Sequence, residues 1–130
     1  MAAPKPILVV LTLSTCPHSI RFINNDLPTL KRILDGRTDV SLQHVKYGET
    51  KYPEELTTIM RSVPSFAIVN PYTWHRGSGL KLEIYGMHYE RGRLVEDSYV
   101  KPPTVPNLIE WMENAIKLPK ITSQEPGIMF

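Results

Sequence analysis

The sequence predicts an α/β domain in which a four-stranded mixed sheet carries helices on both faces, in the order β-α-β-α-β-β-α. Three observations predict this fold class. A continuous run of apolar and β-branched residues over 7–13 (ILVVLTL) is typical of a strand that is covered on both faces. From Pro17 onward the apolar residues recur with a helical period. A further strand–helix pattern and two neighbouring strands follow, so both parallel and antiparallel pairs are expected.

A helical crossover joins the first two strands. Apolar residues recur on one stripe over 17–36, and Pro28 inside this stretch predicts a kink or a division into two helices. Asn25 or Asp26 is then expected to cap the second piece. Residues 40–45 alternate between apolar and polar and predict a strand, which a right-handed crossover makes parallel to the first.

The remaining predicted elements are, in chain order, a helix over 53–60, a strand over 66–69, a strand over 80–85 and a last helix over 106–118. The two strands are expected to form an antiparallel hairpin across a long loop at 70–79. An irregular stretch at 87–103 follows them. The domain therefore spans 1–118, and 119–130 is a C-terminal tail without structure of its own, whose apolar end at 128–130 is expected on the body or on a partner.

The composition excludes several classes of protein. The 15 basic residues are scattered among 13 acidic ones, so a concentrated surface for nucleic acid is not expected. No stretch approaches the roughly 20 apolar residues of a membrane span, and the apolar N-terminal run is interpreted as a strand, not a targeting segment. One cysteine allows no internal disulfide and favours an intracellular, reducing compartment such as the cytoplasm. His44, His75 and His88 lie in different elements, so no metal site is expected.

Cys16 is placed where a strand ends and a helix begins. Pro17 suits the first helical position, because its missing N–H would have no partner there. Free backbone N–H groups at a helix start stabilise a thiolate and can lower a thiol pKa from about 8.5 to about 3.5–7.5. His18 would add positive charge when protonated, and Ser19 would donate a hydrogen bond to sulfur. The alternative is an inert thiol that caps the helix as a small apolar residue.

Two segments resemble the thioredoxin superfamily. C16-P-H-S19 stands where that family has its CxxC motif, and MRSVPSFAIV, residues 60–69, is similar to the segment that holds the family's cis-proline. The resemblance covers residues 6–118. It implies that Cys16 is a nucleophile, that Val63 pairs its backbone with an extended substrate, and that the peptide bond before Pro64 is cis.

The sequence departs from the family pattern at three places. Ser19 stands where the second cysteine would be, so an outside thiol such as glutathione must release any mixed disulfide. Thr15 replaces the tryptophan before the motif, and the glutathione signature of glutaredoxins is missing after the fourth strand. The resemblance therefore implies no bound cofactor, with glutathione only as an external thiol.

The loop at 70–79 (NPYTWHRGSG) is a candidate partner-binding segment. It brings together Tyr72, Trp74, His75 and Arg76, residue types that are frequent at binding hot spots. In the alternative interpretation, Tyr72 or Trp74 folds back onto the edge of the sheet.

Two functions are compatible with these features. In the first, the protein is a monothiol redox protein in which Cys16 exchanges disulfides with a protein thiol or glutathione, tuned by His18 and Ser19. In the second, it is a catalytically silent interaction module within a larger assembly. That module would use the 71–79 loop, the 87–103 insertion and the tail to contact a protein partner. The sequence leaves open whether the protein is an enzyme.

Overall fold

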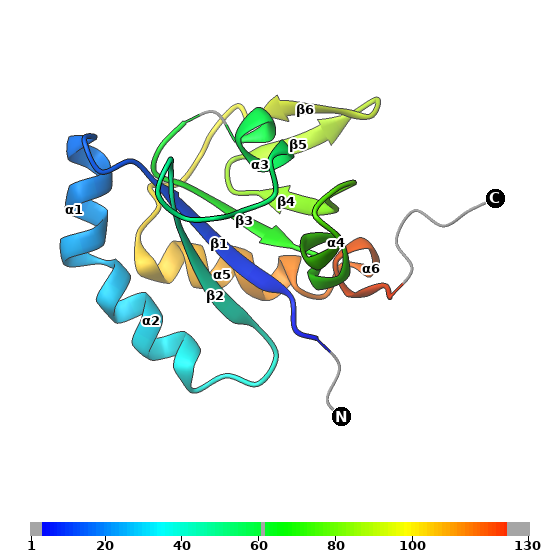
Figure 1. Cartoon of the computed structure of the whole chain (residues 1–130), viewed down its shortest axis with the longest axis horizontal. Helices are drawn as coiled ribbons and strands as arrows, with labels where there is room; N and C mark the ends of the chain where they lie inside the picture. The colour runs from blue at the N-terminus through cyan, green and yellow to red at the C-terminus, as the bar shows by residue number, and fades with distance from the viewer. Residues whose placement is uncertain (1–3, 61, 125–130) are drawn as a thin grey trace.

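The computed structural model describes residues 4–60 and 62–124 (Figure 1). Its helices and strands are, in order, β1 (Ile7–Thr12), α1 (Pro17–Asn25), α2 (Leu27–Asp35), β2 (Ser41–Lys46), α3 (Glu55–Ile59), β3 (Ser65–Val69), α4 (Pro71–Arg76), β4 (Leu82–Ile84), β5 (Met87–Glu90), β6 (Arg93–Glu96), α5 (Val105–Ala115) and α6 (Pro119–Thr122). Strands β1 to β4 form a four-stranded mixed sheet, and β5 and β6 form a separate ribbon. The predicted α/β class is confirmed.

The sheet has the strand order β2-β1-β3-β4, with β1 at its centre. β1 and β2 are parallel over their whole length, from Ile7 opposite Ser41 onward. β1 and β3 are antiparallel, and Leu11 near the end of β1 lies opposite Ser65 at the start of β3. β4 is antiparallel to β3 at the edge. The parallel pair is connected through α1 and α2, as the pattern predicted.

Two apolar cores lie on the two faces of this sheet. All six residues of β1 are buried, and the five apolar ones, Ile7 to Leu11, alternate between the cores. Leu8 and Val10 pack with α1, α2 and α5, whereas Val9 and Leu11 pack with α3 on the other face. Helices therefore cover both faces, as Figure 1 shows. The strand that precedes Cys16 is therefore enclosed on both faces.

The helical stretch before β2 is divided, as Pro28 predicted. α1 ends at Asn25, α2 begins at Leu27, and Asp26 occupies the N-cap position between them, but its side chain makes no capping hydrogen bond to α2. Pro28 lies in the first turn of α2, where backbone N–H groups have no partner within the helix, so its missing N–H costs no hydrogen bond.

The loop expected at 70–79 contains a helix, α4, so that prediction was wrong. The side chain of Asn70 accepts hydrogen bonds from the backbone N–H groups of Tyr72 and Thr73, at 2.8 and 3.2 Å, and so caps the helix. Gly77 ends it in a left-handed conformation with φ 84°. Asn, Pro and Gly are typical of turns, but here Asn70, Pro71 and Gly77 mark the two ends of a short helix.

The irregular stretch expected at 87–103 contains the β5–β6 hairpin, which corrects a second expectation. Its two-residue turn is formed by Arg91 and Gly92, both with positive φ, as a tight hairpin turn requires. The ribbon makes no ladder with the main sheet. The ribbon is largely exposed, so its apolar alternation is weak and the sequence pattern does not predict its two strands.

The tail expected from 119 begins with a helix, α6. Ile121 on this helix is fully buried in the core that contains Leu8 and Val10. The side-chain amide of Asn70 donates hydrogen bonds to the carbonyl groups of Lys120 and Ser123, at 2.9 and 2.8 Å. The folded domain therefore continues past residue 118. The expected contact of 128–130 lies outside the described residues.

We expect Ile121→Ala to lower the free energy of unfolding by about 2–5 kcal/mol, because it leaves a cavity in the core. Ile33→Ala is the matched control. That side chain is 39% exposed, and its loss should cost about 1 kcal/mol or less. Urea denaturation of both variants checks the prediction. Equal changes would mean that α6 is not part of the cooperative unit.

The hairpin contains a histidine between two carboxylates. His88 Nδ1 lies 2.6 Å from the carboxylate of Asp97, and Nε2 lies 2.7 Å from that of Glu90. The hydrogen bonds to Glu90 and Asp97 raise the pKa of His88 above its ordinary value of 6.5. Both nitrogens donate at once only when the ring is protonated.

This raised pKa predicts how stability depends on pH. The protonated ring contributes stability that is complete below about pH 6.5 and is lost as the pH rises through the raised pKa of the folded state. We therefore expect wild type to exceed His88→Gln in stability by more at about pH 6 than at about pH 9. Denaturation curves at both pH values measure this difference, and a pH-independent difference contradicts the prediction.

Candidate thiol site at the end of the central strand

The backbone places Cys16 at the start of α1, as the sequence predicted. Cys16 is the N-cap residue, in extended conformation, and Pro17 follows it in the first turn. Its N–H donates to the carbonyl of Leu13 and its carbonyl accepts from the N–H of Ile20, both at 3.0 Å. These two bonds hold the turn between β1 and α1, so the position of the sulfur depends on the end of β1.

The sulfur lies beside the second segment that the sequence singled out. Cys16 Sγ is 3.9 Å from the carbonyl oxygen of Val63, although the two residues are 47 positions apart. The Val63–Pro64 peptide bond is cis, as predicted. Cys16 is half-buried, and so are Val63 and Pro64. The structure thus brings together the two segments that carried the resemblance.

Backbone N–H groups act on the sulfur. They lower the pKa of Cys16 below its ordinary value of 9.0. The largest cause is a hydrogen bond from the backbone N–H of Ser19. Burial opposes it, and the N–H of His18 and the hydroxyl of Ser19 add to it. A larger fraction of this thiol is therefore ionised near neutral pH than in an ordinary cysteine.

Ser19 has two roles in this arrangement. Its side chain is fully buried, and its hydroxyl oxygen accepts a hydrogen bond from the N–H of Leu13 at 3.0 Å. The hydroxyl proton is left to donate toward Cys16, which is one cause of the lowered pKa. The residue in the place of a second cysteine thus ties the end of β1 to α1 and supports the thiolate.

The part of His18 that the structure places at the sulfur is its backbone, and the expected effect of its ring charge on the thiolate stays a prediction. Its side chain is exposed, and what it contributes to the lowered pKa of Cys16 is its backbone N–H. His18 also lines a hollow together with Val63 and Pro64.

Two hollows lie on either side of Val63, which lines both. The first, here called the proline groove, has a volume of about 620 Å³. It is lined by His18, Arg21, Phe22, Asp26, Val63, Pro64, Pro102, Pro103 and Thr104. The second, here called the apolar pocket, has a volume of about 510 Å³. It is lined by Leu11, Leu13, Tyr47, Thr57, Thr58, Met60 and Val63.

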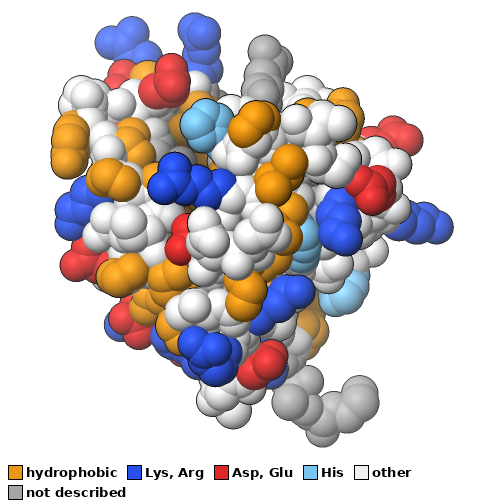
Figure 2. All heavy atoms as spheres, turned by 90° about the vertical axis from the view of Figure 1, so that its left-hand side faces the viewer, with side chains coloured by type: hydrophobic (Ala, Val, Ile, Leu, Met, Phe, Trp, Pro, Cys, Tyr) orange, Lys and Arg blue, Asp and Glu red, His pale blue; other side chains and the backbone are white. Residues whose placement is uncertain are grey.

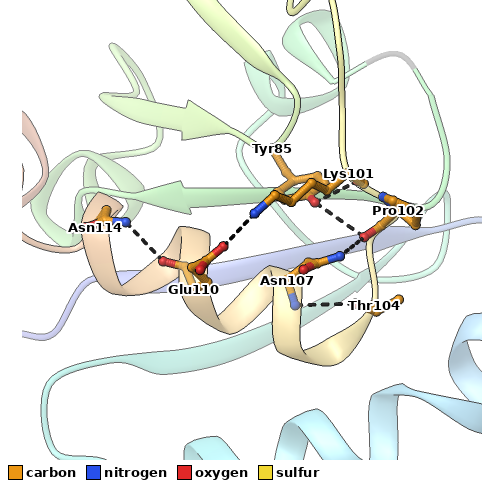
Figure 3. A network of polar contacts seen from close by, with 7 residues as sticks. All are labelled: Tyr85, Lys101, Pro102, Thr104, Asn107, Glu110 and Asn114. Carbon is orange, nitrogen blue, oxygen red and sulfur yellow. Dashed lines mark hydrogen bonds and ion pairs between the residues drawn. The ribbon is translucent and has the colours of Figure 1, made fainter.

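One wall of the proline groove is held by a polar network that sequence reasoning missed (Figure 3). The hydroxyl of Tyr85 donates to the carbonyl of Lys101 at 2.7 Å, and the side-chain amide of Asn107 donates to the carbonyl of Pro102 at 2.9 Å. Thr104 caps α5 by accepting from the N–H of Asn107. A threonine just before a helix with a proline in its first turn was the available signal for this cap.

The face on the left of Figure 1, where α1 and α2 lie, is seen directly in Figure 2. Side chains of both charges are interspersed with apolar ones over this face. Ile20 on α1 and Ile33 on α2 have exposed fractions of 43% and 39%. Charge therefore does not gather into one patch on this side of the molecule.

The four residues predicted to bind a partner are not brought to the thiol. α4 follows the end of β3, and the register puts that end beside the start of β1, away from Cys16. Trp74 is half-buried and packs against the core on the α3 face. His75 and Arg76 are exposed, and the guanidinium group of Arg76 donates to the carbonyl of Ser78 at 3.1 Å. Tyr72 is half-buried.

No protein-family model matches the chain, and comparisons with curated proteins and with solved structures found no match either. The site is therefore interpreted from the geometry of the chain itself. Within residues 4–60 and 62–124, no three His, Cys, Asp or Glu side chains are placed to hold a metal ion. No helix in that part of the chain combines the length and apolar character that a bilayer span requires.

We expect Ser19→Ala to raise the pKa of Cys16, because the substitution removes a donor to the thiolate and loosens the turn that presents the N–H groups. The absorbance of the thiolate, titrated against pH with Cys16→Ala as blank, measures the change. Ser14→Ala, at an exposed serine two residues before the cysteine, is the control and should leave the pKa unchanged.

Proposed function

We propose that the protein is a thioredoxin-like monothiol redox protein in which Cys16 exchanges disulfides with a protein thiol or with glutathione. The observation that carries the proposal is the position of the sulfur, at the N-cap of α1 and 3.9 Å from the carbonyl of Val63. The strand order β2-β1-β3-β4, with one parallel and two antiparallel pairs, supports the thioredoxin-like assignment.

The proposed exchange has two steps. The Cys16 thiolate attacks one sulfur of an external disulfide, a bond forms between the two sulfurs, and the other sulfur leaves as a thiolate that takes a proton from water. A second, external thiolate then attacks the mixed disulfide and restores Cys16. Ser19 has no sulfur and cannot be this second thiol. Release of the partner from the mixed disulfide therefore depends on external thiols, such as those of a reducing intracellular compartment.

Val63 is the proposed docking residue for the partner chain. It is half-buried at the junction of the two hollows, and its carbonyl faces the sulfur. An extended segment bonded to Cys16 therefore passes along the backbone of Val63 and Pro64. Backbone pairing of this kind gives affinity, and neighbouring pockets give specificity.

An interaction module without turnover is the second candidate, and a specific observation favours it. The hairpin and the segment that follows it expose four large apolar side chains, Tyr89, Val95, Tyr99 and Val100, with exposed fractions from 36% to 74%. Such side chains are typical of a surface that contacts another protein. In this function Cys16 is only a structural cap.

The reaction of the reduced protein with glutathione disulfide separates the two functions. We expect mass spectrometry to detect one glutathione bound to wild type and none to Cys16→Ala, and excess reduced glutathione should remove it. The rate should rise with pH and level off at a lower pH than for a thiol of pKa 9.0, because the thiolate is the attacking species. Tyr99→Ala, remote from the thiol in sequence and highly exposed, is the control and should react as wild type. A rate that keeps rising up to pH 9.0 would contradict the redox proposal and favour the interaction module.

A further inference from the structure

The apolar pocket differs in chemistry from the proline groove. Its floor contains Leu11 and Met60, which are 1% and 3% exposed, and Tyr47 at its rim is 49% exposed. Of the seven described residues that line it, none carries a charge. The proline groove, in contrast, has Arg21 and Asp26 in its lining. The apolar pocket is therefore suited to an uncharged, apolar group.

The apolar pocket and the thiol share one neighbour, Val63. Val63 lines the pocket, and the carbonyl of Val63 is the group within 3.9 Å of Cys16 Sγ. Consecutive residues of an extended chain are about 3.3 Å apart, so a residue next to a cysteine bonded to Cys16 lies within reach of this pocket. The occupant is then a side chain of the same segment that carries the reacting sulfur.

Glutathione fits the apolar pocket less well than an apolar side chain of a protein segment does. It carries two carboxylates and an ammonium group, and the described lining of the apolar pocket offers no charge to any of them. The start of α5, beside the proline groove, is also poor in donors. Pro106 has no N–H, and the N–H of Asn107 is taken by Thr104 at 3.3 Å.

We propose that the disulfide partner of Cys16 is an extended protein segment, an inference that rests on the proposed exchange at Cys16. The segment has a large apolar side chain next to its cysteine, and that side chain enters the pocket formed by Leu11, Tyr47 and Met60. Glutathione then serves only as the thiol that releases the mixed disulfide. Tyr47 is the specificity-determining residue, because it supplies an exposed apolar wall that can be removed without emptying the core.

The test uses short peptides whose cysteine forms a mixed disulfide with nitrothiobenzoate. Cys16 attacks the peptide sulfur, the peptide becomes bonded to Cys16, and the nitrothiobenzoate thiolate leaves and is followed by its absorbance. The residue beside the peptide cysteine, on either side, is leucine, phenylalanine or serine. Glutathione carrying the same leaving group is a separate arm.

We expect the leucine and phenylalanine peptides to react about tenfold or more faster than the serine peptide and than the glutathione derivative. Tyr47→Ser should reduce the leucine-to-serine ratio at least about threefold, because a wall of the pocket is lost. Tyr99→Ser is the matched control, since that tyrosine is 74% exposed and does not line the pocket, and it should keep the wild-type ratio. Circular dichroism confirms that both variants are folded.

The remaining outcomes overturn the inference in distinguishable ways. Rapid reaction with every probe, without preference among peptides, overturns the apolar pocket as a subsite and leaves the exchange at Cys16 standing. The same holds if glutathione reacts fastest or if Tyr47→Ser keeps the full preference. No reaction with any probe overturns the proposed exchange itself, and this inference with it.

Discussion

The antiparallel pairing of β1 with β3 is the constraint on which the site depends. Because Leu11 lies opposite Ser65, the residues that follow β1 and those that precede β3 emerge at the same end of the sheet. Cys16 and Val63 meet there across 47 residues of sequence. The register is strongly specified, since β1 is buried on both faces and a slip by one residue would exchange its two sets of side chains between the cores. The distance between sulfur and carbonyl is thus fixed by the packing of the central strand.

The helix start then determines the chemistry of the sulfur. The backbone N–H groups that every helix leaves free in its first turn are directed at Cys16 and lower its pKa. Burial of the thiol opposes this effect by raising the pKa. Ser19 shows how a one-thiol site keeps this environment without a second sulfur. Its hydroxyl accepts from Leu13 and is oriented toward Cys16, so the same group holds the turn and supports the thiolate. A cysteine at this position would supply a competing nucleophile and a weaker hydrogen-bond acceptor.

The sequence was sufficient where a local rule acts alone. The buried run of β1, the division of the helices near Pro28 and the N-cap position of Cys16 each follow from residue type and spacing. It was insufficient where tertiary contacts decide. α6 has four residues and is held by the burial of Ile121 and by hydrogen bonds from Asn70, which no periodicity reveals. The apolar pocket was missed for the same reason, because its walls come from the ends of different elements.

The proline groove is preorganised by the core behind it. A row of aromatic rings packs behind the groove, with successive ring centroids 5.0, 6.3 and 5.3 Å apart, formed by Phe22, Phe66, Tyr85 and Trp111. The hydroxyl of Tyr85 donates a hydrogen bond to the carbonyl of Lys101. The wall that faces Val63 is therefore anchored to packed aromatic rings that cannot move without disturbing the core. A wall held in this way loses little conformational entropy when a chain binds against it. Because the wall is already ordered, we expect differences in affinity between partners to come from the groups that each partner places beside Val63. In the proposed exchange, the pocket on the α3 face, whose described lining is uncharged, is where such groups are distinguished by polarity.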